Sequence, residues 1–256
     1  MSAAKIKKIL FSQNFPPNFE KSPYAEIRRK YEVSIDFYKF FRIKGIPLNE
    51  FRKNRISLLD YTALILTSKN AIDHFFRIAK ELKIKMPNTI KYFCINAVTA
   101  NYVRKYTACH KRRMIYPVDG TPESLVSLIK EYPSDNFLFP LAMDSSINQL
   151  EKLLDEEQTA YTKAEVFKIS FDNISKAIDI YSYDMVVFFS PYGIQTLMYT
   201  YPDFKQGKMV IGALGARVIA AAKDVGLDVQ VMAPTSEHSS IFSAIDTFLQ
   251  KSNGYK

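Results

Sequence analysis

Small polar residues follow four short apolar segments of the sequence, at the points where helical patterns begin. Ser68, Lys69 and Asn70 follow the first of these segments. The other three joints carry polar residues or glycines: Asn96 and Thr99, Ser190 and Tyr192, and Gly212 and Gly215. The start of a helix attracts anions through unpaired N–H groups and a partial positive charge, and glycine lets a ligand approach the backbone closely. The pattern predicts a binding site for several carboxylates or phosphates.

Ser, Thr and Asn before a helix are also ordinary N-cap residues, so each of these side chains alone has a purely structural explanation. Their recurrence at corresponding joints favours a shared binding face. In parallel α/β sheets, ligands bind outside the carboxyl ends of the strands, which is where these joints are expected to lie.

Conventional catalytic motifs are absent from the sequence. It contains no nucleophile elbow, no P-loop and no Rossmann glycine fingerprint, and the Gly212–Gly215 spacing is too weak to indicate a nucleotide site. The two cysteines and three histidines are scattered, so we expect no disulfide framework and no metal site. An enzyme built from this chain would act mainly by positioning its substrate and by electrostatics.

The formal net charge of +9 fits either a solvated basic surface or an anionic partner. Nucleic acid is one such partner, but the densest basic run, residues 110–113, is short and no nucleic-acid-binding signature accompanies it. We therefore expect a small polyanion and no nucleic acid. The apolar runs are too short to cross a bilayer and no secretory signal is recognisable, which predicts a cytoplasmic protein without membrane contact.

Alternating strand and helix patterns favour an α/β fold with parallel sheets. Buried strands are predicted at Ile6–Phe11, Ala63–Leu66, Tyr92–Ile95, Met185–Phe189 and Met209–Ile211. Helices are predicted at Tyr24–Tyr31, Ala71–Leu82, Thr99–Tyr106, Glu123–Tyr132, Ser146–Leu154, Ile194–Tyr199, Ala216–Val225 and Ser239–Leu249.

An ordered series of segments occurs twice, which predicts two similar lobes. The segment 64–71 resembles 187–194, 94–100 resembles 210–216, and 121–125 resembles 235–239. Two half-exposed alternating stretches, 38–44 and 164–171, are predicted to be linker strands. Lobe one would then combine residues 1–37 with 172–256, and lobe two would span 45–163. We expect each lobe to hold a parallel sheet flanked by helices, with a polar cleft between the lobes.

These segments together resemble the uroporphyrinogen-III synthase family over nearly the whole chain. The motifs that carry the resemblance are Ile65–Ser68, Asn96–Ala100, Phe137–Pro140, Phe188–Gly193 and Ile211–Arg217. The resemblance implies a two-lobed fold without a cofactor. It also implies that the substrate is hydroxymethylbilane, a linear tetrapyrrole with eight carboxylates, which loses water and closes into a ring while its last pyrrole is inverted.

The resemblance also implies roles for particular residues. It adds Gly193 and Phe167 to the substrate-binding residues of the four joints and makes Tyr192 the candidate proton donor. Phe167 stands where many members of the family carry a tyrosine, and the joint Leu214–Gly215 and the first strand end, Ser12–Gln13, also depart from the family pattern. The alternative is therefore a protein that keeps the fold and binds a tetrapyrrole or another polyanion without catalysis. We expect a monomer in either case.

Overall fold

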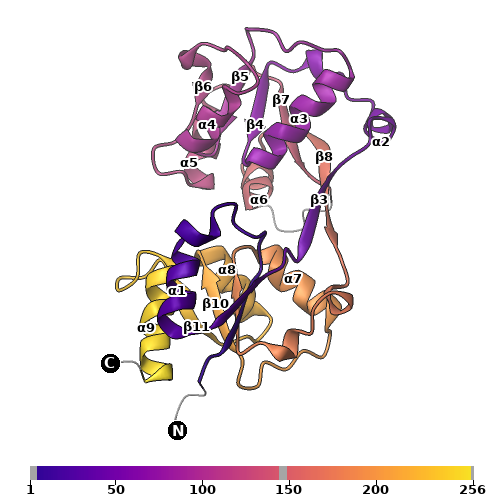
Figure 1. Ribbon diagram of the computed structural model, residues 1–256. Helices are drawn as coiled ribbons and strands as arrows, with labels where there is room; N and C mark the ends of the chain where they lie inside the picture. Colours follow the sequence, from indigo (N-terminus) through magenta and orange to yellow (C-terminus); the bar gives the residue numbers. More distant parts are fainter. Residues whose placement is uncertain (1–4, 144–148, 255–256) are drawn as a thin grey trace. The chain divides into compact units, whose positions relative to one another are not determined.

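The computed structural model describes residues 5–143 and 149–254. The chain divides into two units, unit 1 comprising Met1–Arg42 and Ser170–Lys256 and unit 2 comprising Ile43–Ile169. Figure 1 shows the elements of each unit. Within the described residues, no helix combines the length and the hydropathy that a membrane span requires.

Unit 1 contains a five-stranded sheet in the order β11-β10-β9-β1-β2. All of its neighbouring strands are parallel. The strands are β1 (Lys8–Phe11), β2 (Ser34–Phe37), β9 (Met185–Phe188), β10 (Val210–Leu214) and β11 (Val229–Ala233). The helices are α1 (Pro23–Tyr31), α7 (Pro191–Thr200), α8 (Ala216–Asp224) and α9 (Ile241–Asn253).

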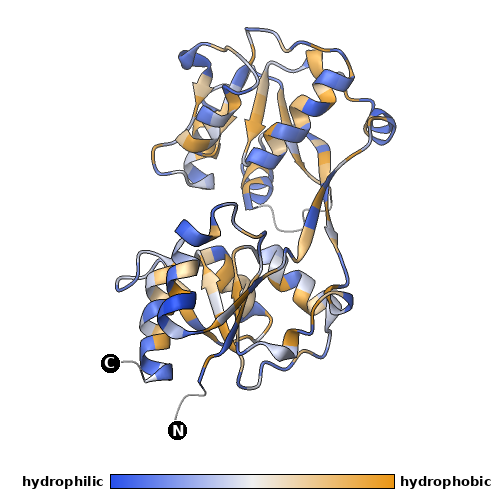
Figure 2. Cartoon of the chain, in the orientation of Figure 1, coloured by the Kyte–Doolittle hydropathy of each residue, from blue (hydrophilic) through white to orange (hydrophobic). Residues whose placement is uncertain are grey.

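Helices cover both faces of the unit 1 sheet, because successive side chains of a strand point to opposite faces. Ile9 and Phe11 pack with α1 and α9, whereas Leu10 between them packs with α7 and α8. Burial on both faces explains why these strands read as continuous apolar runs. Figure 2 shows the same layering, with hydrophobic strands between helices whose outer sides are hydrophilic.

Unit 2 contains a six-stranded sheet in the order β3-β8-β7-β4-β5-β6. The strands are β3 (Phe41–Gly45), β4 (Ala63–Leu66), β5 (Lys91–Cys94), β6 (Met114–Ile115), β7 (Phe137–Ala142) and β8 (Thr162–Phe171). The helices are α2 (Leu48–Phe51), α3 (Lys69–Glu81), α4 (Ala97–Val103), α5 (Pro122–Lys130) and α6 (Gln149–Glu156). Helices α3 and α4 cover one face of the sheet, and α5 and α6 cover the other.

The two sheets repeat one plan. In unit 1 the order β11-β10-β9-β1-β2 matches β6-β5-β4-β7-β8 of unit 2, and the helices after the matching strands correspond as well. The fold is therefore the predicted α/β architecture of two similar lobes with parallel sheets. The strands β3 and β8 carry the chain from one unit to the other, and β3 adds one strand to the sheet of unit 2 beyond the shared plan.

The five predicted strands and eight predicted helices are all present, with ends that differ by a few residues. The predicted start of α6 at Ser146 lies outside the described residues, and the helix is described from Gln149. Strand β7 was not predicted; it contains Pro140, a residue type that is uncommon in central strands. Its pairing with β4 ends at Leu138, so the missing N–H of Pro140 falls beyond that ladder.

Candidate functional site

The joint between β9 and α7 places Ser190 and Tyr192 at the carboxyl edge of the unit 1 sheet. Ser190 is the N-cap of α7, and its Oγ accepts a hydrogen bond from the backbone N–H of Tyr192 at 3.3 Å. The Tyr192 ring is half-buried and lies 5.5 Å from the ring of Phe41. The serine thus fixes the start of the helix, and the phenol is held by packing beside it.

Gly193 lies in the first turn of α7, against the end of β1. A Cβ at Gly193 would come within 3.0 Å of Phe188 Cδ1 and 3.4 Å of Ser12 Oγ. Ser12 follows β1 directly, is only 5% exposed, and its hydroxyl has no hydrogen-bond partner among the described residues. The absence of a side chain at Gly193 therefore lets α7 sit close to the strand ends.

Replacing Ser12 by alanine is expected to leave the free energy of unfolding unchanged or to raise it by up to about 1 kcal/mol. The reason is that a buried hydroxyl without a partner costs free energy that a methyl group does not. Urea unfolding of Ser12→Ala measures this effect. Ser190→Ala is the control, because losing a helix cap should lower stability by about 1 kcal/mol. A loss of that size in Ser12→Ala would show that its hydroxyl is satisfied.

The joint between β10 and α8 uses glycine. Gly215 is the N-cap of α8 with φ of 93°, a conformation that favours glycine, and its N–H donates to the Ala233 carbonyl at 2.7 Å. Gly212 lies inside β10, where a Cβ would meet Val187 Cγ2 at 3.1 Å. Gly215 thus lies at the end of the strand, whereas Gly212 is buried inside the sheet. Contact of either glycine with a ligand stays a prediction.

Unit 2 repeats the capped joints at neighbouring strands β4 and β5. The Oγ of Ser68 accepts a hydrogen bond from the N–H of Ala71 at 3.1 Å, capping α3. The Oδ1 of Asn96 accepts one from the N–H of Thr99 at 2.9 Å, capping α4. These side chains act as N-caps, as the structural alternative predicts. They also bring two helix starts to one edge of the sheet.

The other predicted residues of this edge differ in exposure. Lys69 is the first residue of α3 and is exposed, whereas Asn70 is half-buried. Thr99 is 6% exposed, so only a small part of it is open to a ligand. Lys69 is therefore an exposed cation at the start of α3.

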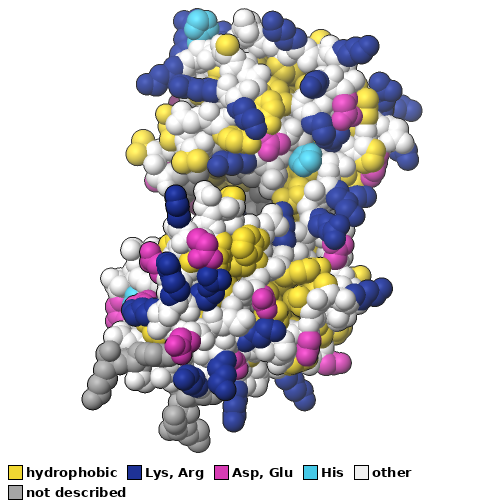
Figure 3. All heavy atoms as spheres, viewed as in Figure 1, with side chains coloured by type: hydrophobic (Ala, Val, Ile, Leu, Met, Phe, Trp, Pro, Cys, Tyr) yellow, Lys and Arg dark blue, Asp and Glu magenta, His cyan; other side chains and the backbone are white. Residues whose placement is uncertain are grey.

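Burial favours a neutral phenol at Tyr192, and one arginine lies near enough to act on it. Burial raises the pKa of Tyr192, and the nearby Arg217 guanidinium partly opposes this shift. Arg217 lies in the first turn of α8 and forms no ion pair within the described residues. Figure 3 shows Lys and Arg side chains spread over the visible surface of each unit. An anion at the strand ends of unit 1 would meet this arginine.

Phe167 lies in β8 and is 6% exposed. Its ring packs at 5.5 Å against the ring of His74, which is carried by α3. The described contacts of Phe167 belong to the core of unit 2. A contact between this ring and the substrate stays a prediction.

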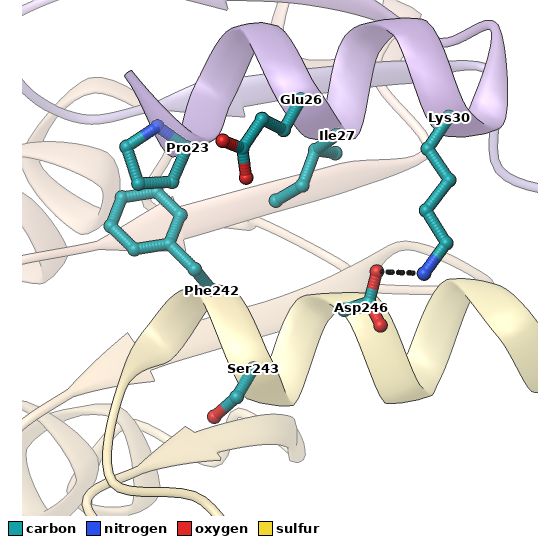
Figure 4. A pocket seen from close by; sticks show the side chains of 7 residues that line it. All are labelled: Pro23, Glu26, Ile27, Lys30, Phe242, Ser243 and Asp246. Atoms are coloured by element: carbon teal, nitrogen blue, oxygen red, sulfur yellow. Dashed lines mark hydrogen bonds and ion pairs between the residues drawn. The ribbon is translucent and has the colours of Figure 1, made fainter. Parts of the chain in front are cut away.

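A pocket of about 310 Å³ lies between α1 and α9, and residues from the first turn of each helix help to line it. Apolar and polar side chains line it, and the ion pair of Lys30 and Asp246, at 2.7 Å, lies at one end (Figure 4). The lining residues are Pro23, Glu26, Ile27, Lys30, Phe242, Ser243 and Asp246. In the part of the chain that the structure describes, no three His, Cys, Asp or Glu side chains are arranged to hold a metal ion.

Sequence reasoning placed the serine and asparagine caps at their joints but missed two charged groups near them. Arg217 ends the motif Ile211–Arg217 and was not predicted to be a ligand. Lys105 lies beyond α4, and only the structure brings it near Lys69. Its spacing of three residues from Tyr102 is the one signal that could have indicated a shared surface.

The fold and these joints define the class of the protein, a two-unit α/β protein whose parallel strands end at polar, capped helix starts. The sequence matches the family HEM4, described as uroporphyrinogen-III synthase HemD, over residues 26–243. The chain belongs to this family of cyclising lyases of tetrapyrrole biosynthesis, as the resemblance implied.

Solved structures agree on the fold. A mutant uroporphyrinogen III synthase from the extremely thermophilic bacterium Thermus thermophilus is 14% identical, with a TM-score of 0.67 over 97% of this chain and 99% of that one. Uroporphyrinogen-III synthetase from Helicobacter pylori 26695 is 15% identical, with a TM-score of 0.59 over 96% of this chain and 99% of that one. A search of curated protein sequences found no match.

Proposed function

We propose that this chain converts hydroxymethylbilane into uroporphyrinogen III, with loss of water and inversion of the terminal pyrrole ring. The family match carries the proposal, and the capped helix starts at the carboxyl edges of both sheets support it. Backbone N–H groups at helix starts suit the acetate and propionate side chains of this substrate. Ser68, Asn96 and Ser190 hold these helix starts in place.

The chemistry begins with departure of the substrate hydroxyl. A proton donated to that oxygen lets the C–O bond break and water leave, while the pyrrole π-system supplies electrons to the cationic carbon. Tyr192 is the proposed donor, because its burial keeps the phenol protonated. Ring closure then passes through a spiro intermediate: the cationic carbon bonds to the substituted α-carbon of the terminal pyrrole, the bond from that α-carbon to its methylene bridge breaks, and the freed methylene carbon bonds to the other α-carbon of the same pyrrole. That α-carbon loses its proton, which balances the proton donated at the start, so the net reaction releases only water.

The isomer assay tests this proposal directly. Purified protein is mixed with hydroxymethylbilane, and the products are oxidised to porphyrins and separated into type I and type III isomers. The type III isomer should form faster than the spontaneous type I isomer. Formation of type I alone, at the spontaneous rate, would contradict the proposed activity.

A non-catalytic tetrapyrrole-binding protein is the second candidate. The observation that favours it is Phe167, a buried apolar ring at a position where the resemblance leads one to expect a tyrosine hydroxyl. Calorimetry separates the two candidates, because tight binding of a tetrapyrrole without turnover would identify the binding protein.

A further inference from the structure

Two tyrosines of unit 2 share one carboxylate near the start of α3. Asp73, one turn into α3, accepts hydrogen bonds from Tyr102 Oη at 2.9 and 3.1 Å, and also from Tyr106 Oη. The Tyr106 ring stacks on Phe76 of α3, with 4.8 Å between centroids and 3° between planes. These contacts fix the two phenol rings against α3.

Two lysines lie over the fixed Tyr102 ring. The Nζ atoms of Lys69 and Lys105 are each 5.3 Å from its centroid, within the range of a cation–π contact. Lys105 Nζ also donates to Tyr102 Oη at 3.4 Å and lies 5.4 Å from the Tyr106 centroid. Two flexible ammonium groups thus contact the same aromatic ring.

The cluster holds two lysines and one carboxylate, so its charges are only partly balanced. Neither lysine forms an ion pair with a carboxylate in residues 5–143 or 149–254. Asp73 is the acid that contacts the cluster, and its oxygens are engaged by the two phenol hydroxyls. Like charges held together repel each other, and a bound anion relieves that repulsion.

We infer that Lys69 and Lys105, positioned by Tyr102 and Asp73, bind the acetate and propionate carboxylates of one pyrrole ring of the substrate. The inference rests on the proposed function, which supplies a ligand with paired carboxylates. Lys69 connects the cluster to the strand edge, because it is the first residue of α3 after Ser68. Lys105 and Tyr102 are thereby added as substrate-binding residues, and Asp73 as a positioning residue.

The test compares Lys105→Ala with Lys85→Ala, which removes the same charge from an exposed lysine beyond the other end of α3. Lys105→Ala should raise KM for hydroxymethylbilane roughly five- to tenfold, as expected for one lost charge-assisted contact, and leave kcat unchanged. Its KM should also depend less steeply on salt than the wild-type KM. Lys85→Ala should match the wild type.

Asp73→Asn tests the positioning role. It keeps both lysines and should raise KM less than Lys105→Ala does, with kcat unchanged. The new amide oxygen can still accept a hydrogen bond from one tyrosine hydroxyl, so the variant should remain folded. Its thermal unfolding is measured to check this. A fall in kcat with unchanged KM in either variant would overturn the inference.

Binding of uroporphyrin III, followed by porphyrin fluorescence, separates this inference from the proposed function. If the wild type makes no type III isomer but Lys105→Ala alone binds uroporphyrin more weakly, the lysine site stands and the proposed reaction falls. If Lys105→Ala and Lys85→Ala bind equally well, the site is overturned while the reaction is unaffected. Failure of the wild type to bind uroporphyrin would overturn the site.

Discussion

Tyr192→Phe is expected to lower kcat for type III isomer formation about a hundredfold, the lower range of a general-acid contribution. The substitution removes only the phenol hydroxyl, so the packing of the ring against Phe41 and the cap from Ser190 to the backbone are kept. Stability and KM should therefore change little. Initial rates with hydroxymethylbilane, with type I and type III products separated, measure the effect.

The pH dependence of the same variant gives an independent check. Burial raises the pKa of Tyr192 above its ordinary value of 10, so the acid form is complete at neutral pH and is lost only as pH rises through the raised pKa. Activity that depends on this proton should be constant from pH 7 to about 9 and fall at higher pH. That alkaline fall should be absent in Tyr192→Phe.

Tyr199→Phe is the matched control, because Tyr199 lies on the same helix near its other end and is 63% exposed. It should retain wild-type rates. Full activity in Tyr192→Phe would place the proton donor elsewhere and remove the catalytic assignment of Tyr192.

Much of the fold could be predicted because both sheets are buried on both faces. Runs such as Met185–Phe188 are apolar throughout and are followed by a small polar cap, so strand, joint and helix are all visible in the sequence. Strand β11 was missed because it is an edge strand in which Gln230 is exposed. Exposure on one side weakens the apolar run that indicates a strand.

The candidate site was only partly predictable. Ser68, Asn96 and Ser190 could be placed because helix caps have local rules, and their cap bonds are present in the structure. The cluster around Tyr102 depends on contact between α3 and α4, which are about 30 residues apart in sequence. No local pattern encodes such a contact, so Lys105 and Asp73 could not be assigned from the sequence.

Arg77→Met is expected to lower the free energy of unfolding by about 2 kcal/mol. The Nη2 of Arg77 donates to the Ile46 carbonyl at 2.6 Å and to the Val166 carbonyl at 3.4 Å, and so links α3 to the backbone after β3 and to β8. Methionine keeps much of the apolar length but leaves the carbonyl of the buried Ile46 without this charged donor. Urea unfolding at pH 7 measures the change.

Glu81→Gln is the matched control for Arg77→Met. It removes the carboxylate partner of Arg77, an ion pair at 2.7 Å between half-exposed side chains four residues apart. Such a pair contributes only about 0.3–0.5 kcal/mol, so this variant should be almost as stable as the wild type. Equal losses in both variants would assign the effect to the ion pair and contradict the role of the backbone contacts.

The stability of the fold should also depend on pH through His74, whose charge is affected by Arg77 and Asp73. Burial lowers the pKa of His74 below its ordinary value of 6.5, the Arg77 charge lowers it further, and Asp73 opposes the shift. Between the lowered pKa and 6.5, the unfolded chain therefore binds more protons at His74 than the folded chain does. The free energy of unfolding consequently has its full value above pH 6.5 and decreases as pH falls from 6.5 toward the lowered pKa. Arg77→Met removes one cause of the shift, so its stability should decline less steeply between about pH 7 and 5. An unchanged slope would show that Arg77 does not act on His74.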